Sequence, residues 1–330
     1  MAGHRTCDGG TPHAPARVLV TRRLPEGGLD PLVGAGHEVV QRAGDTPYSH
    51  AELVELVATV DGVVCLLTDR IDEEVLKAGA SRSLRVVANV AVGYDNVDVA
   101  AATRLGVDVC NTPGVLDETT ADVAFLLVLS ASRLASEAER DLRDGAWRGW
   151  GVTQYLGHDV HGATLGLVGY GRIGKAVARR ASGFGMQVLH HARHPTGMPG
   201  YVEALDDLLA ESDVVSVHVP LRDDTRHLIG ARELALMRPH AVLVNTARGP
   251  VVDEEALGRA LHAGTLFAAG LDVYEREPEV HPLLLNAPRT VLLPHIGSAS
   301  RATRTQMARV ACRGVCAVLA GEKPENLVIV

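Results

Sequence analysis

Residues 164–174 constrain the fold of this chain more than any other segment, because a strand pattern runs directly into a glycine turn. An apolar run at 165–168 is followed by Gly169, Gly171 and Gly174 in the spacing G-x-G-x-x-G, and a helix pattern continues from there. Strand, glycine turn and helix together open a dinucleotide-binding unit, although an ordinary glycine turn remains the alternative in a chain with 34 glycines.

Each glycine of this segment has an expected role. Gly169 makes the tight turn, Gly171 lets the backbone approach a pyrophosphate, and Gly174 lets the helix lie close to the strand. The free N–H groups and the dipole of the helix start would then hold the phosphates.

The residues after the next predicted strand, 186–190, indicate which dinucleotide is bound. A carboxylate at this position accepts from the 2′-hydroxyl of an adenosine ribose, whereas an arginine suits a 2′-phosphate. No acidic residue occurs between Lys175 and Tyr201, and Arg193 follows the strand. The sequence therefore predicts NADPH in preference to NADH.

The bulk properties describe a soluble globular protein with room for two domains, since 46% of the 330 residues are apolar and 22% are charged. A net charge of −8 argues against a nucleic-acid partner, which would need a basic face. The longest apolar run, 123–129, is too short to span a bilayer. The first sixteen residues are polar, without an apolar signal core, and predict a disordered tail (1–16) of a cytoplasmic protein.

The five cysteines are odd in number and lie mostly in apolar runs, which favours buried free thiols in a reducing compartment. Cys312 and Cys316 have the spacing of two metal ligands on a helix. No cluster of histidine or cysteine joins them, so no metal is expected.

Strands and helices alternate through the chain, which predicts parallel sheets covered on both faces. The first set has strands at 17–21, 38–41, 62–67, 84–89 and 107–110 and helices at 24–34, 51–59, 72–78 and 97–105. A second set has strands at 165–168, 187–190, 214–218, 242–245, 268–272 and 290–293.

Between the two sets, 120–143 resembles one long helix that leaves the first domain and enters the second. The loop 144–161 carries Trp147 and Trp150, and either packs on a partner subunit or wraps its own domain. A last helix at 299–320 is expected to return to the first domain. Residues 323–330 are expected to form no further helix or strand.

The predicted architecture is α/β with two doubly wound parallel-sheet domains. A Rossmann cofactor domain (117–298) is inserted in a discontinuous, flavodoxin-like substrate-binding domain (17–116 and 299–330).

Three polar side chains fall just past predicted strand ends, where open α/β sheets bind ligands. Arg248 would pair with a substrate carboxylate and polarise a carbonyl. His295 would exchange one proton, and a carboxylate such as Glu277 would orient the imidazole and favour its protonated form. Each also has an ordinary interpretation: a capping or phosphate-binding arginine, a solvated charged turn (275–279), and one surface histidine among fifteen.

Several longer motifs occur in order: Val92-Gly93-Tyr94-Asp95-Asn96-Val97-Asp98, Asn111-Thr112-Pro113-Gly114-Val115-Leu116, 245–253, 270–278 and 294–299. Together they resemble the D-isomer-specific 2-hydroxyacid dehydrogenases, and most closely their glyoxylate/hydroxypyruvate reductase branch, which includes bacterial 2-ketogluconate reductases. The resemblance spans about Val18 to Val328.

This resemblance implies that Arg248, Glu277 and His295 are catalytic, and that backbone groups at Val92 and Gly93 hold the substrate carboxylate together with Arg248 and His295. It also implies a homodimer formed through the cofactor domains. Residues expected near the cofactor are Thr120, Gly169, Gly171, Arg172, Ile173, Gly174, Arg193, Pro220, Thr225, Thr246, Ala247, Asp272, His295 and Gly297.

Three functions compete. The first is an NADPH-dependent reductase of glyoxylate, hydroxypyruvate or a related 2-keto acid. The second is another enzyme on this scaffold, such as a D-lactate or phosphite dehydrogenase; a formate dehydrogenase is disfavoured because such enzymes have glutamine where Glu277 stands. The third is a cofactor-sensing protein similar to the corepressors of this fold, which would need peptide-binding extensions.

Overall fold

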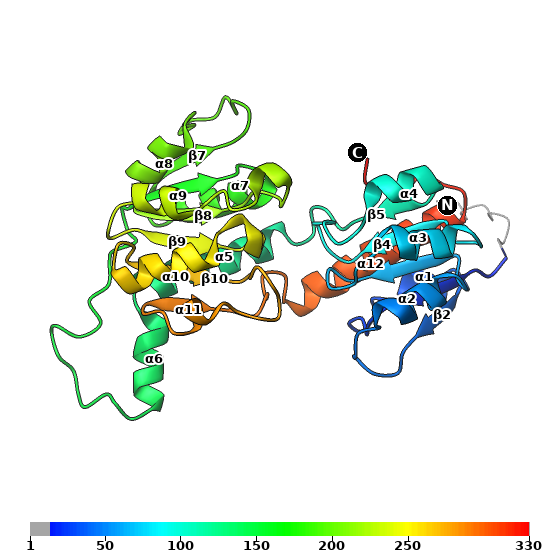
Figure 1. Cartoon of the computed structure of the whole chain (residues 1–330), viewed down its shortest axis with the longest axis horizontal. Coiled ribbons are helices and arrows are strands. Elements are labelled where there is room, and N and C mark those ends of the chain that lie inside the picture. Colours follow the sequence, from blue (N-terminus) through cyan, green and yellow to red (C-terminus); the bar gives the residue numbers. More distant parts are fainter. Residues whose placement is uncertain (1–13, 330) are drawn as a thin grey trace, which may run out of the picture. The chain divides into compact units, whose positions relative to one another are not determined.

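The computed structural model describes residues 14–329, which divide into two compact units (Figure 1). The split unit contains the described residues up to Val115 and from Arg301 onward, and the inserted unit spans Leu116–Ser300. Each unit is built on a wholly parallel sheet covered by helices. The predicted fold class, one doubly wound α/β domain inserted in another, is confirmed.

The split unit has a sheet of five strands among the described residues, in the order β2-β1-β3-β4-β5, as in flavodoxin-like folds. The strands are β1 (Arg17–Val20), β2 (Glu38–Gln41), β3 (Gly62–Cys65), β4 (Val86–Asn89) and β5 (Asp108–Cys110). The helices are α1 (Asp30–Gly34), α2 (His50–Val57), α3 (Glu73–Ala80), α4 (Val99–Leu105) and α12 (Arg301–Leu319). The final helix α12 packs on β3, β4 and β5, which closes this unit with the C-terminal end of the chain (Figure 1).

Three details of the split unit differ from the prediction. The helix expected at 24–34 is reduced to α1, because Pro31 lies in its first turn, where a missing N–H costs nothing, instead of interrupting a longer helix. Ala16, placed in the disordered tail, is buried and accepts from the Glu38 N–H; residues 1–13 of that tail lie outside the described residues. Leu327 pairs antiparallel with Cys110. The C-terminal segment, which was expected to form no further element, therefore covers the free edge of β5.

The inserted unit has a six-stranded sheet in the order β11-β10-β9-β8-β6-β7. Its strands are β6 (Thr164–Val168), β7 (Gln187–His191), β8 (Val214–Val217), β9 (Val242–Asn245), β10 (Ala268–Leu271) and β11 (Thr290–Leu292). Its helices are α5 (Asp117–Ser132), α6 (Ala135–Arg143), α7 (Arg172–Ser182), α8 (Leu205–Glu211), α9 (Ala231–Leu236), α10 (Glu254–Ala263) and α11 (Pro282–Leu285), with short 3₁₀ turns η1 (Asp223–Thr225) and η2 (Gly249–Val251).

The strand order places the cofactor-binding end of this sheet. Because β7 lies on one side of β6 and β8 on the other, the connections reverse direction at β6. In open α/β sheets, ligands bind beyond the carboxyl ends of the strands at such a switch point. The glycine segment begins at that point, directly after β6.

The long helix predicted at 120–143 is wrong. It is two helices, α5 and α6, bent by 70°, with Leu134 between them in the left-handed region at φ 54°. The apolar α5 packs against α7, β9 and β10, whereas the charged α6 has no buried residue to continue that packing. The His158 N–H donates a hydrogen bond to the Ser132 carbonyl where the chain crosses the end of α5. Among the described residues no single helix is long and apolar enough to cross a membrane. Only the bent pair α5 and α6, counted as one helix, would be long and apolar enough.

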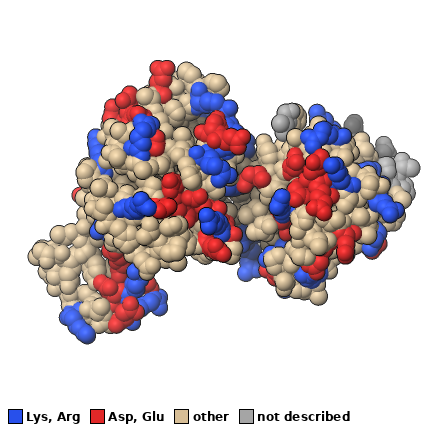
Figure 2. Space-filling view, viewed as in Figure 1, with Lys and Arg blue, Asp and Glu red and all other residues tan. Residues whose placement is uncertain are grey.

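On the face shown in Figure 2, acidic and basic side chains are found on both units, and groups of the two signs lie close together. In the loop 144–161, Trp150 is 84% exposed and Val152 and Leu156 are also exposed, whereas Val160 is buried in the core. The end of the loop packs on its own unit, where His158 contacts the Phe267 ring, and packing of the exposed part on a partner subunit stays a prediction.

Candidate active site

His295 and Glu277 form a direct pair in the inserted unit. His295 Nδ1 lies 2.8 Å from Glu277 Oε2, and both side chains are about one-quarter exposed at 27%. His295 follows β11 and Glu277 follows β10, and these strands are parallel neighbours. Because neighbouring parallel strands end at the same edge, two residues eighteen positions apart in sequence meet. The pair predicted from the sequence is thus in contact.

The backbone that presents His295 is held by Asp272, a buried residue directly after β10. The His295 N–H donates to the Asp272 carbonyl, and the Asp272 carboxylate accepts from the N–H groups of Ile296 and Gly297, each at 2.7 Å. His295 itself has φ 54°, a conformation unusual for a side chain of this size. Such strain, held in place by surrounding bonds, is characteristic of functional positions.

Arg248 is carried by a turn whose shape Asn245 and Gly249 determine. The buried Asn245 amide donates to the Arg248 carbonyl and accepts from the Ala247 N–H, both at 2.9 Å. A Cβ on Gly249 would lie 1.8 Å from the Tyr274 carbonyl carbon, so only glycine lets this turn pack against the segment before Glu277. Arg248 is half-buried and its guanidinium also donates to the Ala247 carbonyl.

The surroundings of Glu277 favour its ionised form. Burial alone would raise its pKa, but the hydrogen bond and positive charge of His295 act in the opposite direction. The Tyr274 N–H, which donates to Glu277 Oε1 at 3.0 Å, and the charge of Arg248 act in the same sense as His295. The net effect lowers the pKa of Glu277 below its usual value. The carboxylate is therefore charged at neutral pH and lies within hydrogen-bond distance of the His295 imidazole.

The glycine segment has the geometry that a dinucleotide requires. Gly169 has φ 104°, and a Cβ on it would lie 2.7 Å from the His218 backbone. A Cβ on Gly174 would lie 2.4 Å from the Gly169 carbonyl, so the first turn of α7 packs tightly on the end of β6. Gly171 is the N-cap of α7 and a Cβ on it would meet no atom within 4 Å. That open space beside uncapped helix N–H groups fits a pyrophosphate.

Several further predicted cofactor residues lie at the same edge of this sheet. A Cβ on Gly297 would lie 3.4 Å from Cγ2 of the buried Thr120. The Thr246 hydroxyl is buried and has no hydrogen-bond partner among the described residues, as expected of a group that bonds to a ligand.

Four other residues predicted to lie near the cofactor make contacts within the protein. The Thr225 hydroxyl donates to the Pro220 carbonyl at 2.7 Å and so shapes its own loop. Arg172, at the start of α7, pairs with Asp117 at 3.2 Å, and Ile173 packs into the core on that face of the sheet. For these four residues the structure gives a local structural role.

Sequence reasoning missed His190, which lies in β7 just before Arg193. Its imidazole is fully buried and stacks on Tyr170 of the glycine segment, with ring centroids 3.8 Å apart. His190 Nε2 lies 2.7 Å from the Thr196 hydroxyl, which ties the loop bearing Arg193 to β7. Arg193 is exposed, with no bonding partner among the described residues. An apolar residue would be expected at such a buried strand position, so the pattern gave no signal for this histidine.

Val92 and Gly93 lie in the split unit, in the segment that follows β4. Both are half-buried and neither is in a helix or strand. The carbonyl of Val92 accepts from Asn111 Nδ2 at 2.7 Å, and that of Gly93 from Asn89 Nδ2 at 2.8 Å.

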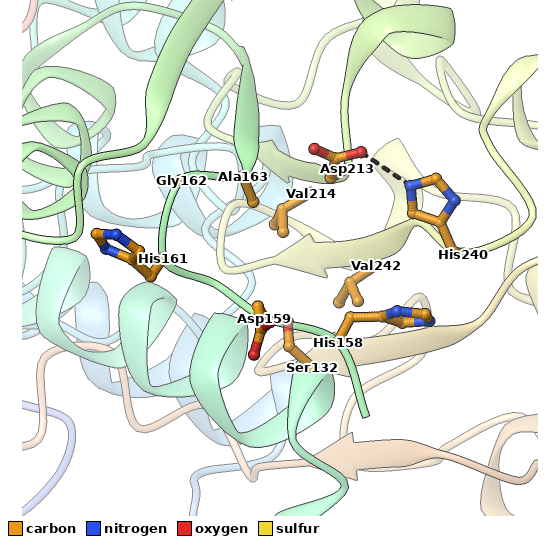
Figure 3. A pocket seen from close by; sticks show the side chains of 10 residues that line it. All are labelled: Ser132, His158, Asp159, His161, Gly162, Ala163, Asp213, Val214, His240 and Val242. Atoms are coloured by element: carbon orange, nitrogen blue, oxygen red, sulfur yellow. Dashed lines mark hydrogen bonds and ion pairs between the residues drawn. The ribbon is translucent and has the colours of Figure 1, made fainter. Parts of the chain in front are cut away.

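A cavity of about 260 Å³ opens at the other end of the inserted sheet (Figure 3). It lies at the amino ends of β6, β8 and β9, and its lining residues are Ser132, His158, Asp159, His161, Gly162, Ala163, Asp213, Val214, His240 and Val242. Asp213 is held there by His240 at 2.8 Å and by the Thr164 N–H. Because Arg248 and His295 follow the carboxyl ends of the strands, this cavity is not part of their site.

Within residues 14–329, no group of three or more histidine, cysteine or acidic side chains is arranged to hold a metal ion. Cys65, Cys110 and Cys312 are buried free thiols, and Cys316 is a partly buried one, whereas Cys7 lies outside the described residues. Burial raises the pKa of the Cys110 and Cys312 thiols to about 12, which makes both unreactive.

Comparison with known proteins agrees with this geometry. Residues 125–297 match the NAD-binding domain of the D-isomer specific 2-hydroxyacid dehydrogenases. This match covers more than half of the chain, and the chain belongs to that family.

Individual relatives are similar over nearly the whole chain. A glyoxylate reductase of Korarchaeum cryptofilum is 48% identical, over 94% of this chain and 95% of its own length. The structure of TT0316 from Thermus thermophilus has a TM-score of 0.90 and 46% identity, covering 95% of this chain and 100% of its own. That of an NADPH-dependent glyoxylate/hydroxypyruvate reductase from Sinorhizobium meliloti, in complex with NADP and malonate, has a TM-score of 0.85 and 35% identity, covering 96% and 97%.

Proposed function

We propose that this protein reduces a small 2-keto acid, such as glyoxylate or hydroxypyruvate, to the D-2-hydroxy acid with NADPH. The observation that carries the proposal is the 2.8 Å pair of His295 and Glu277, with Arg248 close enough to influence the carboxylate. Curated relatives at 42–48% identity are named glyoxylate reductases.

The reduced nicotinamide, when bound, supplies the hydride. The chain would do the rest: Arg248 binds the keto acid and stabilises negative charge on the carbonyl oxygen, and His295 gives that oxygen a proton. Glu277 orients the imidazole and favours its protonated form. Backbone groups at Val92 and Gly93 would bind the substrate carboxylate.

The direct test mixes purified protein with NADPH and glyoxylate and follows the absorbance of the reduced nicotinamide. Consumption of NADPH that depends on glyoxylate supports the proposal. Cofactor binding without turnover on any keto acid would instead support the cofactor-sensing alternative, and turnover on phosphite or D-lactate alone would support another dehydrogenase of this scaffold.

Arg193 is proposed to select NADPH, since no acid occurs between Lys175 and Tyr201 to bind a ribose hydroxyl. We expect Arg193→Asp to shift the ratio of kcat/KM values from NADPH toward NADH by about ten- to hundred-fold, because a charge-assisted phosphate contact is lost and a hydroxyl acceptor is gained. Steady-state kinetics with both cofactors measures the ratio. Arg259→Asp, an exposed change on α10, is the control and should leave it unaltered. A wild-type enzyme that prefers NADH would contradict the assignment.

We further propose a cytoplasmic homodimer, and the exposed part of loop 144–161 supports the dimer. Trp150 at 84% and Val152 at 74% exposure are unusual for a monomer surface, and an apolar cluster of this kind marks a protein interface. We expect light scattering after size exclusion to give twice the mass of one chain, and Trp150→Asp to weaken the dimer. A wild-type protein that stays monomeric at micromolar concentration would exclude this part.

A further inference from the structure

The segment that bears Val92 and Gly93 lies beside two asparagine side chains, the buried Asn89 and the half-buried Asn111. Asn89 is the last residue of β4, and Asn111 follows β5. Because β4 and β5 are parallel neighbours, with Ala88 opposite Cys110, both side chains reach the same short stretch of backbone. Asn111 Nδ2 donates to the Val92 carbonyl at 2.7 Å, and Asn89 Nδ2 donates to the Gly93 carbonyl at 2.8 Å.

These two bonds determine where the neighbouring N–H groups point. A trans peptide is planar, and its C=O and N–H point in opposite directions. The Val92 carbonyl shares a peptide with the Gly93 N–H, and the Gly93 carbonyl shares one with the Tyr94 N–H. Holding each carbonyl against its asparagine therefore turns the N–H of the same peptide away from that asparagine. No hydrogen bond within the described residues uses either N–H.

Consecutive free N–H groups on one side of the backbone form an anion-binding concavity. The stretch is accessible, since Val92 and Gly93 are half-buried and Tyr94 is 38% exposed. Its far end is also fixed: Asn96 Nδ2 donates to the Leu66 carbonyl at 3.0 Å, and Asn96 Oδ1 accepts from Asn89. The backbone of this stretch is thus held in place before any ligand arrives.

We propose that Asn111 and Asn89 are positioning residues that aim the N–H groups of Gly93 and Tyr94 at the carboxylate of the 2-keto acid. The inference rests on the proposed function and adds to it the Tyr94 N–H and the two side chains that orient the donors. Neither asparagine needs to contact the substrate, so their effect is on the affinity for a carboxylate and not on the cofactor.

The test measures carboxylate binding separately from cofactor binding. For Asn111→Ala we expect the KM of glyoxylate and the inhibition constant of oxamate, a 2-keto acid isostere, to rise about ten-fold, because the Val92 peptide is free to rotate. The KM of hydroxypyruvate should rise by the same factor, since the shared group is the carboxylate. The KM of NADPH should not change. Asn111→Asp, which replaces the donor by an acceptor, should raise the same constants further.

The matched control is Gln41→Ala. Gln41 Nε2 also donates to a loop carbonyl of the split unit at 2.7 Å, that of Arg22, and should leave every constant unchanged. Thermal unfolding of each variant checks the fold, and Asn111→Ser is a milder change if Asn111→Ala does not fold. Unchanged glyoxylate KM in a folded variant, or an equal rise for NADPH, would overturn the inference. Wild-type protein inactive on every keto acid would instead refute the proposed function itself.

Discussion

Replacing His295 with alanine is expected to lower kcat for keto-acid reduction about a hundred-fold or more, with little change in NADPH affinity. The reaction makes an alkoxide, and the imidazole 2.8 Å from Glu277 is the group proposed to protonate it. His227→Ala is a close control, because His227 has φ 50° and pairs with Glu275 at 3.0 Å in the same unit. A fully active His295→Ala enzyme would remove the proposed proton donor.

The pH–rate profile tests the partner of this histidine. The pKa of Glu277 is lowered, so in the folded protein its carboxylate stays ionised at pH values where a free glutamate would begin to take up a proton. Over the working range the carboxylate is charged, and kcat for reduction should fall with rising pH as His295 loses its proton. Glu277→Gln keeps an acceptor but removes the charge that favours imidazolium, so the fall should move to lower pH. Coincident profiles for the variant and the wild type would exclude Glu277 from the mechanism.

Arg248→Lys is expected to lower kcat/KM for the keto acid about a hundred-fold, through both a higher KM and a lower kcat. Lysine keeps the positive charge but lacks the planar fork that would hold a carboxylate and a developing alkoxide together. The turn that carries this residue should survive, because it depends on Asn245 and on Gly249. Steady-state kinetics with glyoxylate makes the comparison.

The control for this substitution is Arg232→Lys. Arg232 forms a forked pair with Asp206 at 2.7 and 2.9 Å on the surface of the same unit, so the same loss of geometry occurs there without consequence for activity. If Arg248→Lys left kcat/KM unchanged, Arg248 would have no contact with the substrate.

The strands, the glycine segment and the candidate catalytic residues could all be predicted from sequence patterns. These features depend on local rules: apolar runs end in turns, and glycine is needed where φ is positive or where a Cβ would clash, as at Gly169 and Gly174. The catalytic candidates were found because ligands bind beyond strand ends, a rule that needs only the order of elements.

How those side chains meet, and what supports them, depends on contacts between distant parts of the chain. The bend after α5 lies where Gly157 and His158 pack against the Ser132 carbonyl. These residues are about 25 positions apart, so no local sequence pattern predicts the contact. The buried His190 depends on stacking with Tyr170, twenty residues away in sequence. Asn89 and Asn111 orient the peptides at Val92 and Gly93 because β4 and β5 are neighbours in the sheet. Contacts between residues distant in sequence follow from strand order and packing, and these exist only once the whole domain has folded.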